Sequence, residues 1–441
     1  METQTTCLDL AALANDAGPD PRSRISSMAA GLVGSEILRI AGEIRALIAG
    51  GRTVCNLTVG DFDPRHFPIP AELREGVQAA LERGETNYPP SNGIPELRAA
   101  IVRFYERELG LRYPVDSVLV TGGARPIIYC TFRTLVDPGD RVVFPVPSWN
   151  NNHYVHMMDA VPVPVVCRPE RRFLPSREDL LPALPGARML CLNSPLNPTG
   201  TAFTREDLLG ICEAVLEENE GRARRGERPL FILYDHIYWM LRFGGIPHVT
   251  PPELIPEMAR YTVFVDGISK GFAATGLRVG WAVGPVDIIT RMSAVLGHVG
   301  AWAPRAEQFA TVGLLDNPEA IGRYEAVYQR ELQARLDLLH EGLQAMKREG
   351  LPVDSIPPMG AIYLTARINP FGRRTPEGVE LRTNDEVRRW MLEAAGIGVI
   401  AFQAFGSTED EGWFRMSAGA VSIAEVEAAL PRLAAALRQL A

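Results

Sequence analysis

The amino-acid sequence predicts an α/β protein in which a large domain with a mostly parallel central sheet is joined to a smaller α+β domain. Short β-like runs alternate with helical patterns between residues 118 and 265, and this alternation is typical of a parallel sheet covered by helices. After about residue 316 the pattern changes to a long helical segment, a strand and two further helices. The chain has 441 residues, which leaves room for two or three domains at roughly 150 residues each.

Apolar or β-branched runs bounded by turn residues indicate the strands. Residues 118–121 run into a glycine turn, and residues 230–234 form an apolar run of strand length that ends at an acid. The expected strands are residues 118–121, 141–145, 189–193, 230–234 and 261–265 in the large domain and 361–366 in the small one.

Apolar residues at helical spacing indicate the helices. Between residues 35 and 48 they recur every three or four positions, and the helical pattern of residues 126–135 stops at the turn sequence Asp-Pro-Gly-Asp. The expected helices are residues 35–48, 126–135, 205–218, 319–349, 384–395 and 423–440. The basic run at residues 222–228 follows a predicted helix end, and we expect it to form a solvated loop.

These elements divide the chain into four parts. Residues 1–25, which contain Gly-Pro-Asp-Pro, are expected to form a flexible leader. Residues 26–60 are assigned to the N-terminal part of the small domain, residues 61–315 to the large domain, and residues 316–441 to the C-terminal small domain.

Composition excludes several classes of function. The chain carries 45 Lys+Arg and 53 Asp+Glu, a net charge of −8, so we expect no nucleic-acid partner. It contains no long apolar run for a membrane span and no apolar segment typical of a signal peptide. The six cysteines are scattered without a CxxC pair, which argues against a disulfide framework or a zinc site. We therefore expect a cytoplasmic protein without a bound metal.

Lysine is almost absent from the sequence. Of the 45 basic residues only Lys270 and Lys347 are lysines, so a retained lysine is a candidate for chemistry that arginine cannot perform. Forming a Schiff base is such chemistry, because it requires an amine that can lose its proton. Lys347 ends an amphipathic helix and is expected to be a solvated cation. Lys270 therefore becomes the candidate nucleophile.

Lys270 follows a strand-like run and lies in a glycine-flanked loop, where parallel α/β sheets usually display catalytic groups. Arg278 lies eight residues further on, and a guanidinium there suits a phosphate and disfavours the protonated form of the amine. Asp235 ends the buried strand at residues 230–234 and suits a protonated pyridine nitrogen, although such an acid taken alone is more often a helix cap or a loop residue.

Two turns complete the set of candidate motifs. Residues 120–125, Val-Thr-Gly-Gly-Ala-Arg, read as a strand, a glycine turn and a helix start whose free N–H groups can cradle a phosphate. Residues 193–200, Asn-Ser-Pro-Leu-Asn-Pro-Thr-Gly, form a rigid turn that presents the amide of Asn197.

Together these stretches resemble the fold-type I, pyridoxal 5'-phosphate (PLP)-dependent aminotransferases of the class I/II family, in particular the aspartate-aminotransferase-like enzymes. The resemblance runs from about residue 35 to 420, and the motifs occur in the family's order. It implies that Lys270 forms the Schiff base with PLP and moves the substrate proton. It also implies that Asp235 pairs with the pyridine nitrogen, while Tyr238 and Asn197 contact the ring oxygen.

The same resemblance implies the remaining contacts with cofactor and substrate. The residues expected at the phosphate are Gly123, Ala124, Arg125, Ser269 and Arg278. Trp149 would stack on the pyridine ring, and Tyr88 would reach the phosphate of a neighbouring subunit, which implies a homodimer. Arg415 would bind the substrate α-carboxylate through its bidentate guanidinium, with Gly60 bordering that carboxylate.

Three arginine or glycine positions bear on how phosphate and a distal carboxylate would be bound. Gly267 stands where many relatives carry a Ser or Thr phosphate ligand, so the resemblance predicts the loss of one hydrogen bond. Arg125 either binds the distal carboxylate of a dicarboxylic substrate or, as a helix-start cation, touches only phosphate or solvent. Arg305, contributed by a partner subunit, is a second candidate for that carboxylate.

The sequence therefore predicts a PLP-dependent aminotransferase that moves an amino group from an L-amino acid to a 2-oxo acid in a ping-pong reaction. A glutamate- or 2-oxoglutarate-linked substrate, with aspartate as another candidate, is the preferred expectation. PLP-dependent lyases, ACC-synthase-like enzymes and oxidases share the same motifs, because a fold does not fix the reaction. A non-catalytic PLP-fold regulator is the remaining alternative.

Overall fold

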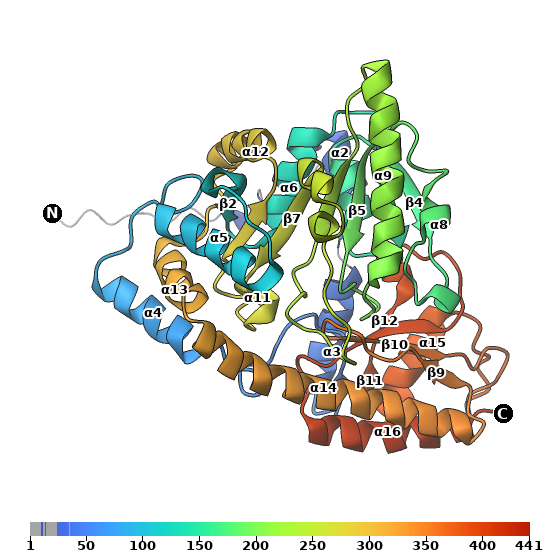
Figure 1. The fold of residues 1–441 in the computed structure, drawn as a ribbon. Coiled ribbons are helices and arrows are strands. Elements are labelled where there is room, and N and C mark those ends of the chain that lie inside the picture. Colours follow the sequence, from blue (N-terminus) through green and yellow to red (C-terminus); the bar gives the residue numbers. More distant parts are fainter. Residues whose placement is uncertain (1–9, 12–13, 15–23, 35) are drawn as a thin grey trace.

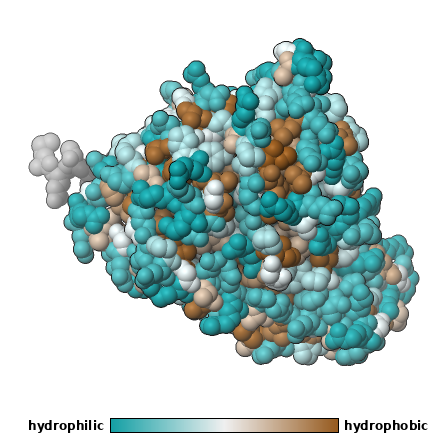
Figure 2. Space-filling view, viewed as in Figure 1, coloured by the Kyte–Doolittle hydropathy of each residue, from teal (hydrophilic) through white to brown (hydrophobic). Residues whose placement is uncertain are grey.

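A computed structural model describes residues 10–11, 14, 24–34 and 36–441 of the protein. Most of the predicted leader, residues 1–25, lies outside the described residues. No helix of the described part is long and apolar enough to cross a membrane. Figure 2 shows that hydrophilic side chains cover most of one face, with apolar side chains in scattered groups between them.

Within the described residues the largest sheet has seven strands in the order β2-β8-β7-β6-β5-β3-β4. Their bounds are β2 Val118–Thr121, β3 Arg141–Val146, β4 Val161–Val166, β5 Ala187–Asn193, β6 Phe231–Asp235, β7 Thr262–Gly267 and β8 Gly280–Val283. Strand β8 runs antiparallel to both of its neighbours, whereas the other paired strands of this sheet are parallel. The predicted mostly parallel sheet is therefore confirmed.

Helices cover both faces of this sheet, as Figure 1 shows. On one face α6 and α12 pack on a core that contains Leu233 and Val265, and on the other face α5, α9 and α13 pack on a core that contains Ile232 and Tyr234. The bounds are α5 Pro95–Leu109, α6 Ala124–Leu135, α9 Arg205–Arg225, α12 Val286–Val299 and α13 Arg305–Leu315. Because both faces are buried, these strands are apolar at almost every position.

The C-terminal part builds a second core. Strands β9 Val353–Ser355, β10 Tyr363–Ile368, β12 Ile400–Ala401 and β13 Trp413–Ser417 form an antiparallel sheet in the order β12-β13-β10-β9. Strand β1, Cys55–Asn56, joins this part by pairing in parallel with β11, Ile397–Gly398. The long helix α14, Pro318–Arg348, runs along the bottom of the molecule in Figure 1, with α16, Ile423–Arg438, beneath it.

The predicted helices and strands are present, with ends that differ by a few residues. The helix expected at residues 35–48 is α3, Glu36–Ala49, and the helix expected at 384–395 is α15, Asn384–Trp390, followed by a π-helical turn. Strand β4, strand β8 and helices α4 (Ala71–Glu82), α5, α12 and α13 were not predicted. Helices α4, α5 and α12 are amphipathic, so their apolar spacing was a usable signal that was missed.

The solvated loop predicted at residues 222–228 is wrong for residues 222–225, which are helical, whereas residues 226–228 are exposed and lie beyond the helix. Helix α9 continues to Arg225, and Arg222 is buried with 4% of its surface exposed. Its guanidinium donates to Glu218 at 2.7 Å and to the main-chain oxygen of Leu184 at 3.0 Å. Arg222 therefore links α9 to the segment that contains Leu184. A count of charged residues in the sequence cannot reveal such a contact.

The turn after β5 brings the two cores together at Gly200. The main-chain oxygen of Gly200 accepts hydrogen bonds from Met359 and Gly360 at 2.9 and 3.0 Å. Its φ of +70° lies in the left-handed region, and a Cβ atom there would overlap the main-chain oxygen of Tyr363. Only glycine allows this close approach of the two chain segments.

We predict that Gly200→Ala lowers the free energy of unfolding by about 3 kcal/mol or more, because left-handed strain and a main-chain clash add together. Gly226→Ala is the matched control, since Gly226 has a φ of +69° with no neighbour within 4 Å. It should cost only about 1–2 kcal/mol. Urea denaturation measures both values, and equal losses would contradict the proposed clash.

Candidate active site

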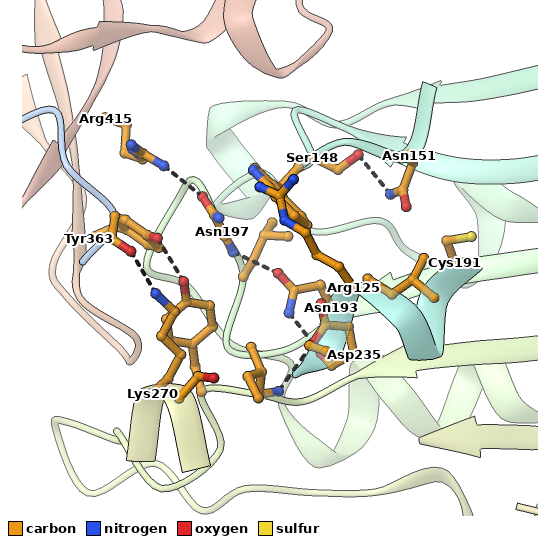
Figure 3. Close-up of a pocket in the computed structure, with 18 of the residues that line it drawn as sticks. Arg125, Ser148, Asn151, Cys191, Asn193, Asn197, Asp235, Lys270, Tyr363 and Arg415 are labelled. Atoms are coloured by element: carbon orange, nitrogen blue, oxygen red, sulfur yellow. Dashed lines mark hydrogen bonds between the residues drawn. The ribbon is translucent and has the colours of Figure 1, made fainter. Parts of the chain in front are cut away.

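A cavity of about 430 Å³ lies where the carboxyl ends of β5, β6 and β7 meet the C-terminal sheet (Figure 3). Residues far apart in the chain line it, from α3, from the first turns of α6, and from β10 and β13. The predicted site residues that line this cavity are Gly60, Ala124, Arg125, Trp149, Asn197, Asp235, Tyr238, Ser269, Lys270, Arg278 and Arg415.

The Lys270 amine lies inside the cavity and donates to the main-chain oxygen of Gly60 at 2.6 Å. The aromatic rings of Phe62 and Tyr238 each have their centres 5.7 Å from the nitrogen. Removal from bulk water lowers the pKa of Lys270 to about 8, and the positive charges of Arg415 and other arginines add to this effect while Asp61 opposes it. About a tenth of the amine is therefore unprotonated at pH 7, far more than for a lysine in water.

Asp235 ends β6 and faces the same cavity. Burial raises the pKa of its carboxyl to about 6, although the Ile237 N–H at 3.1 Å and the positive charge of Lys270 favour the ionised form. The carboxylate is therefore charged at neutral pH and has spare acceptor capacity. Such a group suits a cationic ring nitrogen.

Tyr238 and Tyr363 form a pair of hydroxyls 2.7 Å apart. Burial holds the pKa of Tyr238 well above its usual value, so its hydroxyl remains a neutral hydrogen-bond donor. Tyr363 comes from β10 and approaches Gly60 so closely that a Cβ atom at Gly60 would lie 2.8 Å from its hydroxyl oxygen. Gly60 is thus a glycine because Tyr363 occupies the space beside it.

The start of α6 forms a cradle for an anion. Gly123 caps this helix without any side-chain hydrogen bond, which leaves the first N–H groups of Ala124 and Arg125 free. A Cβ atom on Gly123 would collide with the guanidinium of Arg278, which is anchored to the main-chain oxygens of Thr275 and Gly122 at 2.8 and 3.0 Å. Arg278 has a φ of +57°, a strained conformation that fits a functional position.

Ser269 lines the same end of the cavity, and Gly267 lies two residues before it. A Cβ atom on Gly267 would lie 2.7 Å from both the Gly280 Cα and the Val279 main-chain oxygen. The absence of a hydroxyl at this position, noted in the sequence, therefore has a steric cause. Strand β8 passes too close for any side chain.

Arg415 is a buried cation with 1% of its surface exposed. Its guanidinium donates to Asn197 Oδ1 at 3.1 Å and to the Thr58 main-chain oxygen at 2.6 Å, and it lies between the rings of Tyr363 and Phe405. Among the described residues no carboxylate forms an ion pair with it, and its buried Nε has no partner. A buried charge of this kind calls for an anionic ligand.

Arg125 brings a second guanidinium into the cavity, and its central carbon lies 4.8 Å from the centre of the Trp149 ring. Figure 3 shows this side chain extended toward the middle of the pocket, between Asn193 and Ser148. Within the described part of the chain no ion pair of Arg125 with a carboxylate is found. Its position in the pocket is compatible with a substrate group as well as with phosphate.

Three predicted residues do not line the cavity. Gly123 lies just behind it, against Arg278. Tyr88 is 83% exposed and packs edge-on against Trp302 at 5.5 Å, so its role toward a neighbouring subunit stays a prediction. Arg305 forms an ion pair with Glu85 at 2.6 Å and lies away from the pocket.

Several lining residues carry no sequence motif that predicts them. Tyr363 is one of these, and only its pairing through β10 with the strand of Arg415 brings it into the site. Asp61 accepts a hydrogen bond from Thr275 at 2.6 Å and thereby links the segment beside Lys270 to the Arg278 turn. Helix α3 contributes further lining residues at positions 37, 41 and 45, whose spacing of four was a usable helical signal.

These residues fit PLP, the cofactor implied by the sequence resemblance. The uncapped helix start with Gly123 and Arg278 suits the phosphate, Asp235 suits the pyridine nitrogen and Lys270 suits the aldehyde. Arg415, with its unpartnered Nε, remains for the substrate carboxylate. Within the described residues no cluster of His, Cys, Asp or Glu side chains is arranged to hold a metal ion.

Comparison with known proteins agrees with this geometry. The model of the family "Aminotransferase class I and II" matches residues 52–433. The chain is 33% identical to an aspartate aminotransferase of Rhizobium meliloti (strain 1021), covering 97% of this chain and 99% of the relative. It is 30% identical to an aspartate aminotransferase of Geobacillus stearothermophilus, covering 93% and 98%.

Solved structures give the same result. The crystal structure of the aspartate aminotransferase from Rhizobium meliloti superposes with a TM-score of 0.85 at 32% identity, covering 95% of this chain and 99% of that one. The aspartate aminotransferase from Thermus thermophilus with maleate has a TM-score of 0.83 at 28% identity, with 93% and 99% coverage.

The two lysines allow a direct test of the Lys270 environment. We predict that PLP added to the cofactor-free protein and reduced with borohydride labels Lys270 at a rate that rises with pH through about 8 and then levels off, because the free amine reacts. Peptide mass spectrometry identifies the labelled lysine. Lys347→Ala removes an exposed lysine paired with Asp354 at 2.6 Å and should leave the labelling of Lys270 unchanged. Lys270→Ala should lose the labelled peptide that contains position 270. A rate that is still rising steeply at pH 10 would contradict the lowered pKa.

Proposed function

The chain belongs to the class I and II aminotransferases, and we propose that it transfers the amino group of a dicarboxylic amino acid, aspartate or glutamate, to a 2-oxo acid such as 2-oxoglutarate. Transamination with PLP and the fold-type I architecture follow from membership of this family. The proposal concerns the substrate.

One observation carries the choice of a dicarboxylic substrate. The cavity contains two guanidinium groups, Arg415 and Arg125, in addition to Arg278 beside the phosphate cradle. Neither forms an ion pair with a carboxylate among the described residues, so each is available to a substrate anion. An α-carboxylate and a distal carboxylate would satisfy both cations. The named relatives are aspartate aminotransferases, and one of them was solved with maleate, a dicarboxylate.

The side chains divide the work of the reaction. PLP, when bound, supplies the electron sink that stabilises negative charge at the substrate Cα. Arg415, held by Asn197 and by the Thr58 carbonyl, would bind and orient the α-carboxylate. Lys270, with its lowered pKa, would take the proton from the substrate Cα. It would then deliver that proton to the cofactor carbon bonded to the transferred amino nitrogen.

The remaining residues would set the electrostatics. Asp235 would keep the ring nitrogen protonated, and Tyr238 would donate a hydrogen bond to the ring oxygen. Trp149 would stack on the ring face, with Arg125 beyond it. The start of α6, Ser269 and Arg278 would hold the phosphate, while Gly60 leaves room for the substrate carboxylate beside Tyr363.

We also propose the organisation expected from the sequence. Residues 61–315 would form the large domain, and residues 26–60 with 316–441 the small one; the separate seven- and four-stranded sheets support this division.

The exposed Tyr88 supports a homodimer in which this ring contacts the neighbouring site. Five cysteines are free and buried, which supports a reducing, cytoplasmic location; Cys7 lies outside the described residues.

The visible absorbance of the holoenzyme tests the proposed substrates. L-Glutamate or L-aspartate should bleach the cofactor band, and 2-oxoglutarate should restore it, because amino transfer interconverts the two cofactor forms. Neutral and basic amino acids serve as the comparison set. Bleaching by these alone would refute the dicarboxylate proposal. Turnover without any 2-oxo acid would indicate a lyase or an oxidase.

Arg125 provides the mutational test. We predict that Arg125→Ala lowers kcat/KM for aspartate and glutamate by about 10- to 100-fold, the usual cost of one charge-assisted contact of about 1.5–3 kcal/mol. Alanine as substrate should be affected far less, and Arg125→Lys should recover part of the loss. Steady-state kinetics with each donor gives the answer. Equal losses for both classes would show that Arg125 serves phosphate alone.

A further inference from the structure

A chain of polar side chains lies in the core behind the cavity, and the reaction described above does not use it. Its members are Tyr105 from α5, His236 directly after β6, Asp266 in β7, and His248. Tyr105, His236 and Asp266 expose at most 2% of their surface, whereas His248 is partly exposed and follows the glycine-rich residues 244–247. These four side chains therefore lead from the surface to the centre of the molecule.

Each neighbouring pair is in hydrogen-bond contact. His248 Nε2 lies 3.2 Å from His236 Nδ1, and His236 Nε2 lies 2.9 Å from the Tyr105 hydroxyl. That hydroxyl donates to Asp266 Oδ2 at 3.1 Å. Asp266 also accepts from the Trp239 indole at 3.1 Å and from the Gly267 N–H at 2.7 Å. The path is continuous, with no gap that a water molecule would need to fill.

The path adjoins the catalytic groups at two points. His236 is the residue after Asp235, and alternation along the chain turns their side chains to different sides. Asp266 begins the turn that carries Lys270, because its carboxylate holds the Gly267 N–H. The negative charge of Asp235 also raises the pKa of Asp266, so the two acids are electrostatically coupled.

The hydrogen-bond order allows a proton to pass. With Asp266 ionised, His248 donates to His236, His236 to Tyr105, and Tyr105 to Asp266. A proton from solvent that binds Nδ1 of His248 releases the Nε2 proton to His236 Nδ1. His236 then passes its Nε2 proton to Tyr105, and the Tyr105 proton reaches Asp266. One proton enters, one carboxyl becomes neutral, and no other group changes charge.

The proton affinities suit such a path. Burial raises the pKa of Asp266 to about 7, whereas it lowers the pKa of His236 well below its usual value. Partial burial and the positive charge of Arg242 lower the pKa of His248 as well. Burial likewise keeps the pKa of Tyr105 far above neutrality. The intermediate groups therefore carry a proton without retaining it, and only Asp266 changes charge near neutral pH.

Other titratable groups face the path from the elements packed around it. Apart from the four members these groups are Asp235, Tyr234, Tyr113 and Arg242. Burial keeps Tyr234 and Tyr113 neutral near pH 7 by raising their pKa, and the positive charge of Arg242 helps to keep His248 neutral. Asp235 is thus the one of these four that titrates near the same pH as Asp266.

We propose that His248, His236 and Tyr105 form a proton path between the protein surface and Asp266, and that Asp266 is a positioning residue that adjusts the negative charge behind Asp235. When ionised, Asp266 reinforces Asp235 in stabilising positive charge in the cofactor pocket. When protonated, Asp266 is neutral and no longer stabilises that positive charge. The proposal rests on the transamination shared by the family and is independent of the choice of substrate.

The pH titration of the visible absorbance band of the holoenzyme tests the charge effect. In Asp266→Asn the midpoint should fall by about half a pH unit, the effect of one charge roughly 10 Å away at an effective dielectric constant of about 40. Tyr234→Phe is the matched control, because it removes a buried hydroxyl bonded to the Val249 carbonyl at 2.8 Å and touches the same imidazole. Its midpoint should not move. An unchanged midpoint in Asp266→Asn, or an equal shift in Tyr234→Phe, would overturn the proposal.

Tyr105→Phe is the second variant if Asp266→Asn does not fold, since it keeps the ring and breaks the path. Asp266 loses a donor, stays protonated to higher pH, and the midpoint should again fall. Infrared spectroscopy then observes Asp266 directly. The wild-type holoenzyme should show the C=O stretch of a protonated carboxyl below pH 7, and Tyr234→Phe should keep it.

The rate at which that band appears after a drop in pH tests the path itself. In His248→Leu it should appear at least about tenfold more slowly, because the entry point is lost. Absence of the band in the wild type, or an unchanged rate in His248→Leu, would overturn the assignment.

Discussion

The removal of the Lys270 amine from bulk water is the constraint on which the rest of the site depends. A cation in such a position is costly unless it can lose its proton or find a partner. Among the residues that the structure describes, only the Gly60 main-chain oxygen accepts a hydrogen bond from this amine. The aromatic rings of Phe62 and Tyr238 lie beside it, each with its centre 5.7 Å from the nitrogen. A fraction of the amine is therefore unprotonated near neutral pH and available as a nucleophile and base.

The pocket exists only where two separately built cores meet. The parallel strands of the large sheet deliver Asp235 and Lys270 at their carboxyl ends, and the antiparallel C-terminal sheet delivers Tyr363 and Arg415 from neighbouring strands. The hydroxyl pair of Tyr238 and Tyr363 and the contact of Arg415 with Asn197 join the two sides. A displacement of one core relative to the other would therefore move Asp235 and Lys270 relative to Tyr363 and Arg415.

Charge is distributed unevenly around this junction. Arginines dominate the side where phosphate and carboxylates would bind, and buried acids lie behind the ring position, with Asp235 at the pocket and Asp266 deeper in the core. Desolvation raises the pKa of both acids toward neutrality, so small changes in their surroundings alter their charge near physiological pH. The histidines behind them remain neutral for the same reason and transmit protons instead of holding charge.

The α/β class, the order of the main strands and helices, and a central group of the residues that line the cavity can be predicted from the sequence, because they follow from local periodicity and from motifs such as the loop around Lys270. The scarcity of lysine in the composition is enough to single out that residue. Only the folded structure shows that Tyr363 and Asp61 line the pocket, that Arg222 is buried in an extended helix, and that Gly267 has no room for a side chain. These features depend on contacts between segments far apart in the chain, and no local pattern records how closely two such segments approach.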